Sequence, residues 1–312
     1  MKIPKISILI ILLNLIILLP ATAQSGNVRY AVVPENPAPG EPVTIGVSGG
    51  VKQAVLTVNG RALARTAFFY VPAGDEKLTF MAAILTIPNT LNATSAEIRL
   101  ENENVTMAVI PITISRREFD NEILRLDQAL TDIRTDTSPQ RTEESNRLWD
   151  VLSATGNYVY HTGRFIAPVQ ATRRTSSFAE RRIYIYSDGG RGTSIHTGLD
   201  YGIPTGTEVV SCGNGKVVLA SSMIVAGNAI IIEHAPGIYS LYYHLDKIEV
   251  KEGDFVNAGT RIGLSGATGL ATGPHLHWDI RINTETTDPD FYLARPIIDK
   301  ELIISKIYNT GD

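Results

Sequence analysis

Cysteine is almost absent from this chain of 312 residues, and an excess of positive charge is absent altogether. The single cysteine, Cys212, excludes an internal disulfide and a four-cysteine metal site. We expect it to be a small buried hydrophobe rather than a nucleophile. A formal net charge of −4 argues against a nucleic-acid-binding protein, which needs a basic surface. Intrinsic disorder is excluded as well, because 44% of the residues are hydrophobic.

The N-terminal hydrophobic run is short for a membrane anchor. The 14 residues Ile6–Leu19 would span about 21 Å as a helix, whereas the hydrocarbon core of a bilayer is roughly 30 Å thick. Two lysines precede the run and the small residues Ala21–Ala23 follow it, which is the pattern of a secretory signal. Gln24 stands where an exported lipoprotein would need cysteine. We therefore expect a signal peptide over residues 1–23, export to the periplasm or the extracellular space, and no stable membrane span after cleavage.

Residues 24–115 consist of short β-type runs separated by turn residues. Asn59-Gly60 is a strong signal for a two-residue hairpin turn, and Pro39-Gly40 marks another turn. Runs at roughly ten-residue spacing predict an immunoglobulin-like β-sandwich. The clearest runs are Val43–Val47, Ala54–Val58, Ala67–Val71 and Ala108–Ile114. The segment contains neither histidine nor cysteine, so we expect it to be a spacer or a binding module.

Residues 116–157 show a helical period instead. Apolar residues that step by three or four predict one helix, with its stripe at Phe119, Ile123, Leu126, Leu130 and Ile133. A second helix is predicted after the N-cap Ser138, with Pro139 at its first position and its end near Gly156. Its expected apolar face contains Leu148, Trp149, Val151 and Leu152. The sequence thus predicts a helical hairpin linker between the sandwich and a domain at 158–312.

Histidine is confined to that last domain, where the chain returns to strands and glycine-rich turns. The six histidines are His161, His196, His234, His244, His275 and His277. Their crowding into one half of the chain is the first indication of a functional site.

Three short motifs carry the chemistry. His275 and His277 precede a β-type run, and residues two apart in a strand point to the same face. In His196-x-x-x-Asp200 an imidazole and a carboxylate, both good zinc ligands, are separated by a loop with glycine. His244 ends an aromatic run. Taken singly, each motif has a simpler interpretation. The histidine pair fits a solvated strand, His196-x-x-x-Asp200 fits a surface turn with a capping aspartate, and His244 fits a half-buried histidine. Together they supply three ligands, which leave a fourth zinc position open, and two further histidines.

At this point the sequence resembles the M23 family of zinc metallopeptidases, of the lysostaphin and LytM type. The resemblance covers roughly residues 196–282. It rests on several separated motifs in the same order, namely His196-x-x-x-Asp200, Tyr243-His244-Leu245, Gly266-Ala267-Thr268-Gly269 and Gly273-Pro274-His275-Leu276-His277-Trp278. Asp279 departs from the family, in which many members carry glutamate after the aromatic residue.

The resemblance implies an antiparallel β peptidase domain, which makes the whole chain mainly β. It also implies that one Zn²⁺ per chain is held by His196, Asp200 and His277. His244 and His275 match the two active-site histidines that are not ligands, and which of them acts as base and which stabilises the oxyanion stays open. The remaining two histidines lie outside the set implied by the resemblance.

The expected function is that of an exported zinc endopeptidase that hydrolyses peptide bonds in the stem or cross-bridge peptides of peptidoglycan. The first alternative is a non-catalytic protein on the same fold that binds peptidoglycan or activates another hydrolase. The second is a general secreted protease. For residues 24–157 we expect one of two roles: they position the catalytic domain in the envelope, or they cover its groove until an envelope protein partner binds.

Overall fold

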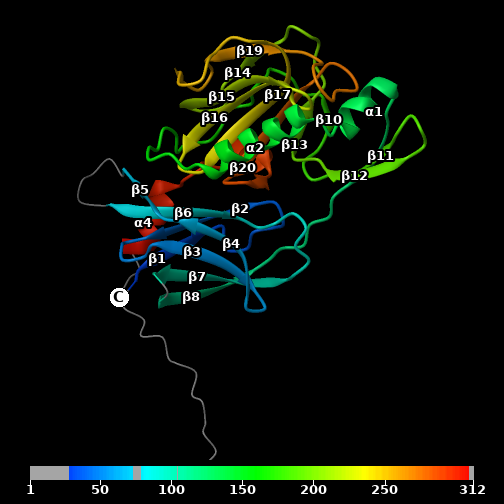
Figure 1. Cartoon of the computed structure of the whole chain (residues 1–312). Coiled ribbons are helices and arrows are strands. Elements are labelled where there is room, and N and C mark those ends of the chain that lie inside the picture. Colours follow the sequence, from blue (N-terminus) through cyan, green and yellow to red (C-terminus); the bar gives the residue numbers. More distant parts are fainter. Residues whose placement is uncertain (1–27, 73–78, 104, 309–312) are drawn as a thin grey trace, which may run out of the picture.

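The computed structural model describes residues 28–72, 79–103 and 105–308. The expected signal peptide at 1–23 lies outside these residues. The chain is mainly β, with a sandwich formed by the first strands and a larger β domain formed by the last half of the sequence (Figure 1). No helix in the described ranges combines the length and the apolar character that crossing a bilayer requires.

The N-terminal strands form the predicted sandwich of two four-stranded antiparallel sheets. One sheet has the order β1-β2-β6-β5 and contains β1 (Tyr30–Val33), β2 (Pro42–Val47), β5 (Phe69–Val71) and β6 (Phe80–Thr86). The other has the order β4-β3-β7-β8 and contains β3 (Gln53–Val58), β4 (Arg61–Ala67), β7 (Ser95–Asn102) and β8 (Val105–Thr113). The predicted turn Asn59-Gly60 joins β3 to β4. Apolar side chains such as Ile45, Leu56 and Ile98 are fully buried between the sheets.

The segment after the sandwich differs from the predicted helical hairpin. It forms a strand, β9 (Asn121–Arg125), then the helices α1 (Gln128–Thr135) and α2 (Pro139–Ser153). The helix predicted from Phe119 is therefore wrong over residues 121–125. β9 pairs in parallel with β11 (Arg181–Ile185), with Ile123 opposite Ile183, so a partner strand 60 residues further along the chain overrides the local helical period.

Helix α2 begins as predicted. The Ser138 hydroxyl accepts a hydrogen bond from the backbone N–H of Arg141, and Pro139 occupies the first turn. Leu148 and Leu152 pack against the C-terminal domain, but Trp149 is 61% exposed and does not belong to the buried face. The helix ends at Ser153, three residues before the predicted stop.

The C-terminal half contains a large antiparallel sheet of ten strands. Its central order is β10-β13-β20-β17-β16-β15-β18, with β14 and β19 paired together, β19 also on β17, and β21 on β20. These strands are β10 (Arg174–Ser176), β13 (Gly198–Tyr201), β14 (Glu208–Val210), β15 (Gly215–Met223), β16 (Gly227–Ala235), β17 (Ile238–Ile248), β18 (Phe255–Val256), β19 (Arg261–Ser265), β20 (Leu276–Ile282) and β21 (Glu285–Thr287). A separate small sheet, β12-β11-β9, is completed by β12 (Arg191–Ile195) and stands beside it.

Two short helices, α3 (Pro289–Ala294) and α4 (Lys300–Tyr308), follow the sheet. The last one, red in Figure 1, leaves the C-terminal domain and lies against β1 and β2 of the sandwich. Ile303 and Ile307 are fully buried there. The approach requires glycine at position 46, because a Cβ atom there would collide with Cγ2 of Ile303. The C-terminal helix thereby fastens the two domains together.

Candidate metal centre

Strand register brings the predicted ligands together. Asp200 on β13 pairs directly opposite His277 on β20, so both side chains leave the same face of the sheet. His196 follows the end of β12 and reaches the same point. The three predicted ligands are therefore gathered, and all three are buried.

Three polar atoms converge at the centre. His277 Nδ1 lies 2.9 Å from Asp200 Oδ1, and His196 Nε2 lies 3.0 Å from each of these two atoms. Zinc ligands at about 2.0–2.1 Å from the metal lie roughly 3.3 Å apart in a tetrahedron. The observed triangle is close to that size, and two imidazoles with one carboxylate are a donor set that suits zinc. The residues present thus fit the metal.

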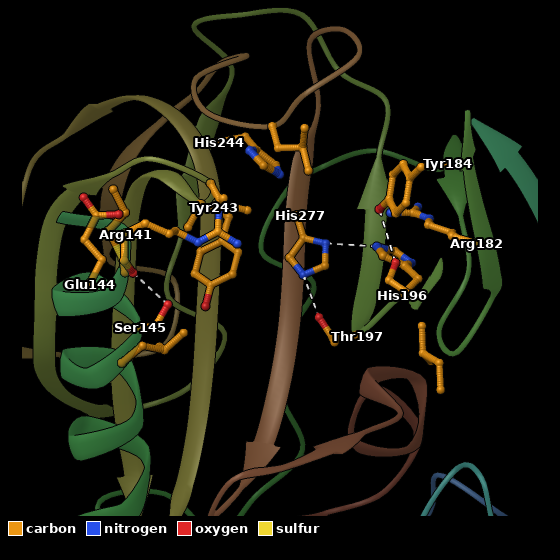
Figure 2. Close-up of a pocket in the computed structure, with 17 residues that line it drawn as sticks. Arg141, Glu144, Ser145, Arg182, Tyr184, His196, Thr197, Tyr243, His244 and His277 are labelled. Carbon is orange, nitrogen blue, oxygen red and sulfur yellow. Dashed lines mark hydrogen bonds between the residues drawn. The ribbon is translucent and has the colours of Figure 1, made fainter. Parts of the chain in front are cut away.

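The outer contacts of the two imidazoles keep their inner nitrogens available. His196 Nδ1 lies 2.7 Å from the carbonyl oxygen of Ser177. A carbonyl only accepts, so Nδ1 carries the proton and Nε2 keeps its lone pair for the centre. His277 Nε2 lies 3.4 Å from the hydroxyl of Thr197 (Figure 2), which leaves Nδ1 on the inner side.

The carboxylate is held in its ionised form. Burial alone would raise the pKa of Asp200, but the hydrogen bonds and attraction that His196 and His277 supply when their inner nitrogens are protonated bring it well below the usual value of 3.8. A bound cation would take the place of these inner protons. Burial lowers the pKa of His277 and so favours the neutral imidazole. An ionised carboxylate beside neutral imidazoles is the protonation state that binds a divalent cation.

Arg182 on β11 anchors the other oxygen of the carboxylate. Its Nη2 donates to Asp200 Oδ2 at 3.0 Å, and its Nε donates to Glu122 Oε2 at 2.9 Å. Glu122 belongs to β9, so a chain of charged contacts runs from the segment between the domains to a candidate metal ligand. Such outer contacts fix the orientation of the ligand.

A β-bulge turns His244 toward the centre. On β16, Asn228 pairs with Leu245 and Ile230 pairs with Tyr242, so one residue opposes two on β17. His244 has a φ of 63°, in the left-handed region, and its ring lies 4.7 Å from the ring of His275. Regular alternation would instead have sent His244 to the face opposite that of Tyr243.

The two remaining predicted histidines present the same nitrogen to the site. Nδ1 of His244 donates to the carbonyl of Thr268 and Nδ1 of His275 donates to the carbonyl of Gly273, each at 2.8 Å. Their Nε2 atoms keep a lone pair, and that of His275 lies 3.8 Å from Asp200 Oδ1. Burial, followed by the neighbouring histidines, lowers the pKa of His244 to about 3, so its ring is neutral at ordinary pH.

A groove crosses the centre and consists of two cavities, of about 270 and 370 Å³. Both are lined by His244 and His277 on the floor and by Arg182 and Tyr184 on the wall formed by β11. The first cavity also borders α2, whose side chains face the centre from the opposite side in Figure 2. The second extends along β9 and β10. Neither is lined by a described residue of the sandwich, so the linker, not the sandwich, borders the groove.

The other histidines and the cysteine lie elsewhere. His234 is fully buried. Its Nδ1 donates to the carbonyl oxygen of Asn214 at 2.8 Å, its Nε2 accepts from the Ser240 hydroxyl at 2.7 Å, and burial lowers its pKa to about 3. His161 stacks on a phenylalanine away from the centre. Cys212 is buried as predicted, and burial raises its pKa to about 12, which makes it a poor nucleophile.

Several groove residues escaped the sequence prediction. Arg182 and Tyr184 lie on a strand 10 to 15 residues ahead of the first motif, and the resemblance begins only at His196. Two arginines directly ahead of the β-type run Ile183–Ile185 were the available signal. Tyr243 belongs to the motif Tyr243-His244-Leu245. Its contact with the centre, where its ring stacks on that of His277 at 5.4 Å, follows only from the pairing of β17 with β20.

Comparisons with known proteins identify the domain that carries this centre. The model of peptidase family M23 matches residues 194–289. A mutant catalytic domain of the prophage-encoded M23 protein EnpA from Enterococcus faecalis is 32% identical, with coverage of 97% of that chain and 42% of this one and a TM-score of 0.34. The chain belongs to peptidase family M23.

Two further relatives extend the comparison. The M23 chain is 42% identical over 114 residues to the peptidoglycan DD-endopeptidase ShyA of Vibrio cholerae, which is 36% of this chain and 26% of ShyA. The match thus spans about a quarter of that relative. A peptidase M23 structure from Pseudomonas aeruginosa is 21% identical, covers 82% of this chain and 94% of its own, and has a TM-score of 0.56. This likeness concerns the fold alone.

Proposed function

We propose that this M23 protein is an exported zinc metalloendopeptidase that hydrolyses peptide bonds in the stem or cross-bridge peptides of peptidoglycan. The observation that carries the proposal is the convergence of His196, Asp200 and His277 on one point of an open groove, with His244 and His275 beside it. The name of ShyA supports the substrate class, and the signal-peptide pattern of residues 1–23 supports export.

The proposed roles follow from the chemistry of each side chain. Zinc bound by three protein ligands lowers the pKa of a water molecule to about 7 and polarises a carbonyl. His244 and His275 direct Nε2 into the groove, where an uncharged imidazole accepts a proton and a charged one donates it. Their roles as general base and as oxyanion or leaving-group partner are interchangeable on this geometry. Asp200, fixed by Arg182, keeps the donor set oriented.

The proposal is tested by incubating the protein with defined muropeptides, with casein and with a metal chelator, followed by mass spectrometry of the products. We expect cleavage of muropeptide amide bonds, slow or no cleavage of casein, and loss of cleavage on chelation with recovery when zinc is restored. Muropeptide binding without cleavage by zinc-loaded protein would contradict the proposal and would favour the non-catalytic alternative. Comparable rates on casein and muropeptides would instead indicate a general protease.

A further inference from the structure

One arginine in the groove has no acidic partner among the described residues. The second cavity contains two arginines, Arg173 and Arg182. Arg182 is paired with Glu122 and Asp200, whereas no carboxylate in the described ranges lies within ion-pair distance of Arg173. A guanidinium at the wall of a cavity, with its donors unused by the protein, is suited to bind an anion on a ligand.

Strand geometry aims Arg173 into the cavity. Arg173 and Thr175 both line it, while the residue between them, Arg174, points away and forms a two-point ion pair with Asp290, with one contact of 2.6 Å. Ser176 lines the cavity as well, because a β-bulge between Arg174 and Ser176 interrupts the regular alternation. The neighbouring arginines therefore have different surroundings, although they share residue type and exposed position.

The position of Arg173 is set by Gly202. The backbone N–H of Gly202 donates to the carbonyl of Arg173 at 3.2 Å, and the Cζ atom of Arg173 lies 3.7 Å from the point where a Cβ atom of residue 202 would stand. The guanidinium thus lies over a bare stretch of backbone. A side chain at position 202 would first meet Cγ2 of Thr175, at 2.6 Å, and would touch the guanidinium only at an ordinary van der Waals distance.

The distance from the centre fits a specific part of a bound peptide. Gly202 is two residues beyond Asp200, and two residues of extended chain cover about 7 Å. One residue of an extended substrate covers about 3.5 Å, and a charged N–H···O contact about 2.8 Å. Arg173 also lines the same cavity as Asp200, His275 and His277, so its guanidinium is placed to reach a group on a substrate residue near the scissile bond.

We propose that Arg173 binds a free carboxylate on the substrate residue next to the scissile bond. The inference rests on the proposed peptidase function and adds a requirement for an anionic substrate. The carboxylate has two sources in a wall peptide: the C-terminus of a stem peptide, or the side chain of an acidic or diamino acid residue within a cross-link. Both present the same group to Arg173.

The test compares Arg173→Gln with its matched control Arg174→Gln. Each is assayed with a stem peptide whose terminal carboxylate is free or amidated, and with a cross-linked dimer whose side-chain carboxylate is free or amidated. Zinc content is measured for every variant. We expect Arg173→Gln to raise KM about tenfold or more on the preferred free carboxylate with little change in kcat, because the contact forms in the ground state as well as in the transition state.

Amidation of the substrate should lower kcat/KM by the same factor in the wild type and in Arg174→Gln. It should leave the kcat/KM of Arg173→Gln unchanged. Arg173→Lys should recover part of the preference, since it restores a charge without the planar fork. The substrate pair that shows the effect identifies the source of the carboxylate. If Arg173→Gln kept the wild-type preference for carboxylate over amide, this inference would be overturned while the proposed function stood. Failure of the wild type to cleave any of the four substrates would overturn the proposed function itself.

Discussion

Asp200 links the candidate metal centre to the rest of the protein. One of its oxygens faces the two imidazoles, and the other accepts a hydrogen bond from Arg182. A carboxylate fixed at one oxygen loses little freedom when the other binds a cation, so the contribution of Arg182 is one of positioning.

Replacement of Arg182 by methionine should weaken zinc binding about 10- to 100-fold, because Asp200 would lose its outer contact. Competition between metal-free protein and a chelating dye measures this affinity. Arg181→Met is the control, since Arg181 contacts Asn89 at the domain interface and not the centre. Equal affinities in the two variants would show that Arg182 has no positioning role.

Buried His234 should make the stability of the protein depend on pH. Burial lowers its pKa from 6.5 to about 3, so between these values the unfolded chain binds more protons than the folded one. The contribution of buried, neutral His234 to the free energy of unfolding is complete above pH 6.5 and is lost as the pH falls toward 3. About 2 kcal/mol of it is lost between pH 7 and pH 5. Urea unfolding at several pH values measures the slope. His234→Gln should flatten it, and an unchanged slope in that variant would refute the assignment.

At the residue scale the sequence predicted more of the centre than of its surroundings. The resemblance, which rests on the order and spacing of the motifs, implied His196, Asp200 and His277 as ligands, and the structure brings these three side chains together. Their role as metal ligands stays a prediction. The orientation of His244 depends on a bulge, which arises from the pairing of β16 with β17 and has no local signal. Arg182 and Arg173 reach the groove through pairings between distant strands.

The linker elements border the groove on both sides of the centre. β9 adds to the edge of the β11–β12 hairpin, and α2 borders the cavity on the other side of the centre. Helix α2 was predictable because its cap, its N-terminal proline and its apolar spacing all lie within the helix. β9 was not, because the stripe from Phe119 fits a helix equally well and only β11, far along the chain, decides between the two.

The Ser138 cap should hold the first turn of α2 in place. Ser138→Ala removes the oxygen that accepts from the Arg141 N–H, which costs about 1 kcal/mol. We expect about fivefold faster hydrogen exchange in the first turns of α2, measured by mass spectrometry of peptides that contain residues 139–145. Ser138→Asp retains an accepting oxygen and should exchange at the wild-type rate. Equal exchange in all three proteins would contradict the role of the cap.

The two domains are joined at the level of the whole molecule by more than the linker. The side-chain amide of Asn89 donates to the hydroxyl of Thr286 at 2.9 Å, and the hydroxyls of Thr86 and Thr287 lie 2.6 Å apart. Together with α4 on β1 and β2, these contacts make the sandwich part of the frame of the catalytic domain. The sequence predicted two β domains but not this docking, since the side of the sandwich that carries Gly46 has no distinguishing pattern.

Ile303→Ala should destabilise the protein by about 2–5 kcal/mol, because the side chain is fully buried between the domains and its loss leaves a cavity. Chemical unfolding of the full chain measures the change. Leu302→Ala is the control on the same helix, at a residue that is 37% exposed, and should cost much less. If the two variants were equally stable, α4 would not fasten the domains.

The central claim is that His196, Asp200 and His277 hold one zinc ion on which hydrolysis depends. The most direct measurement is the metal content of dialysed His277→Ala and His275→Ala proteins, together with their rates on muropeptides. We predict that His277→Ala loses both zinc and activity, whereas His275→Ala retains one zinc per chain and loses activity. A His277→Ala protein that kept stoichiometric zinc and digested muropeptides at the wild-type rate would contradict the account.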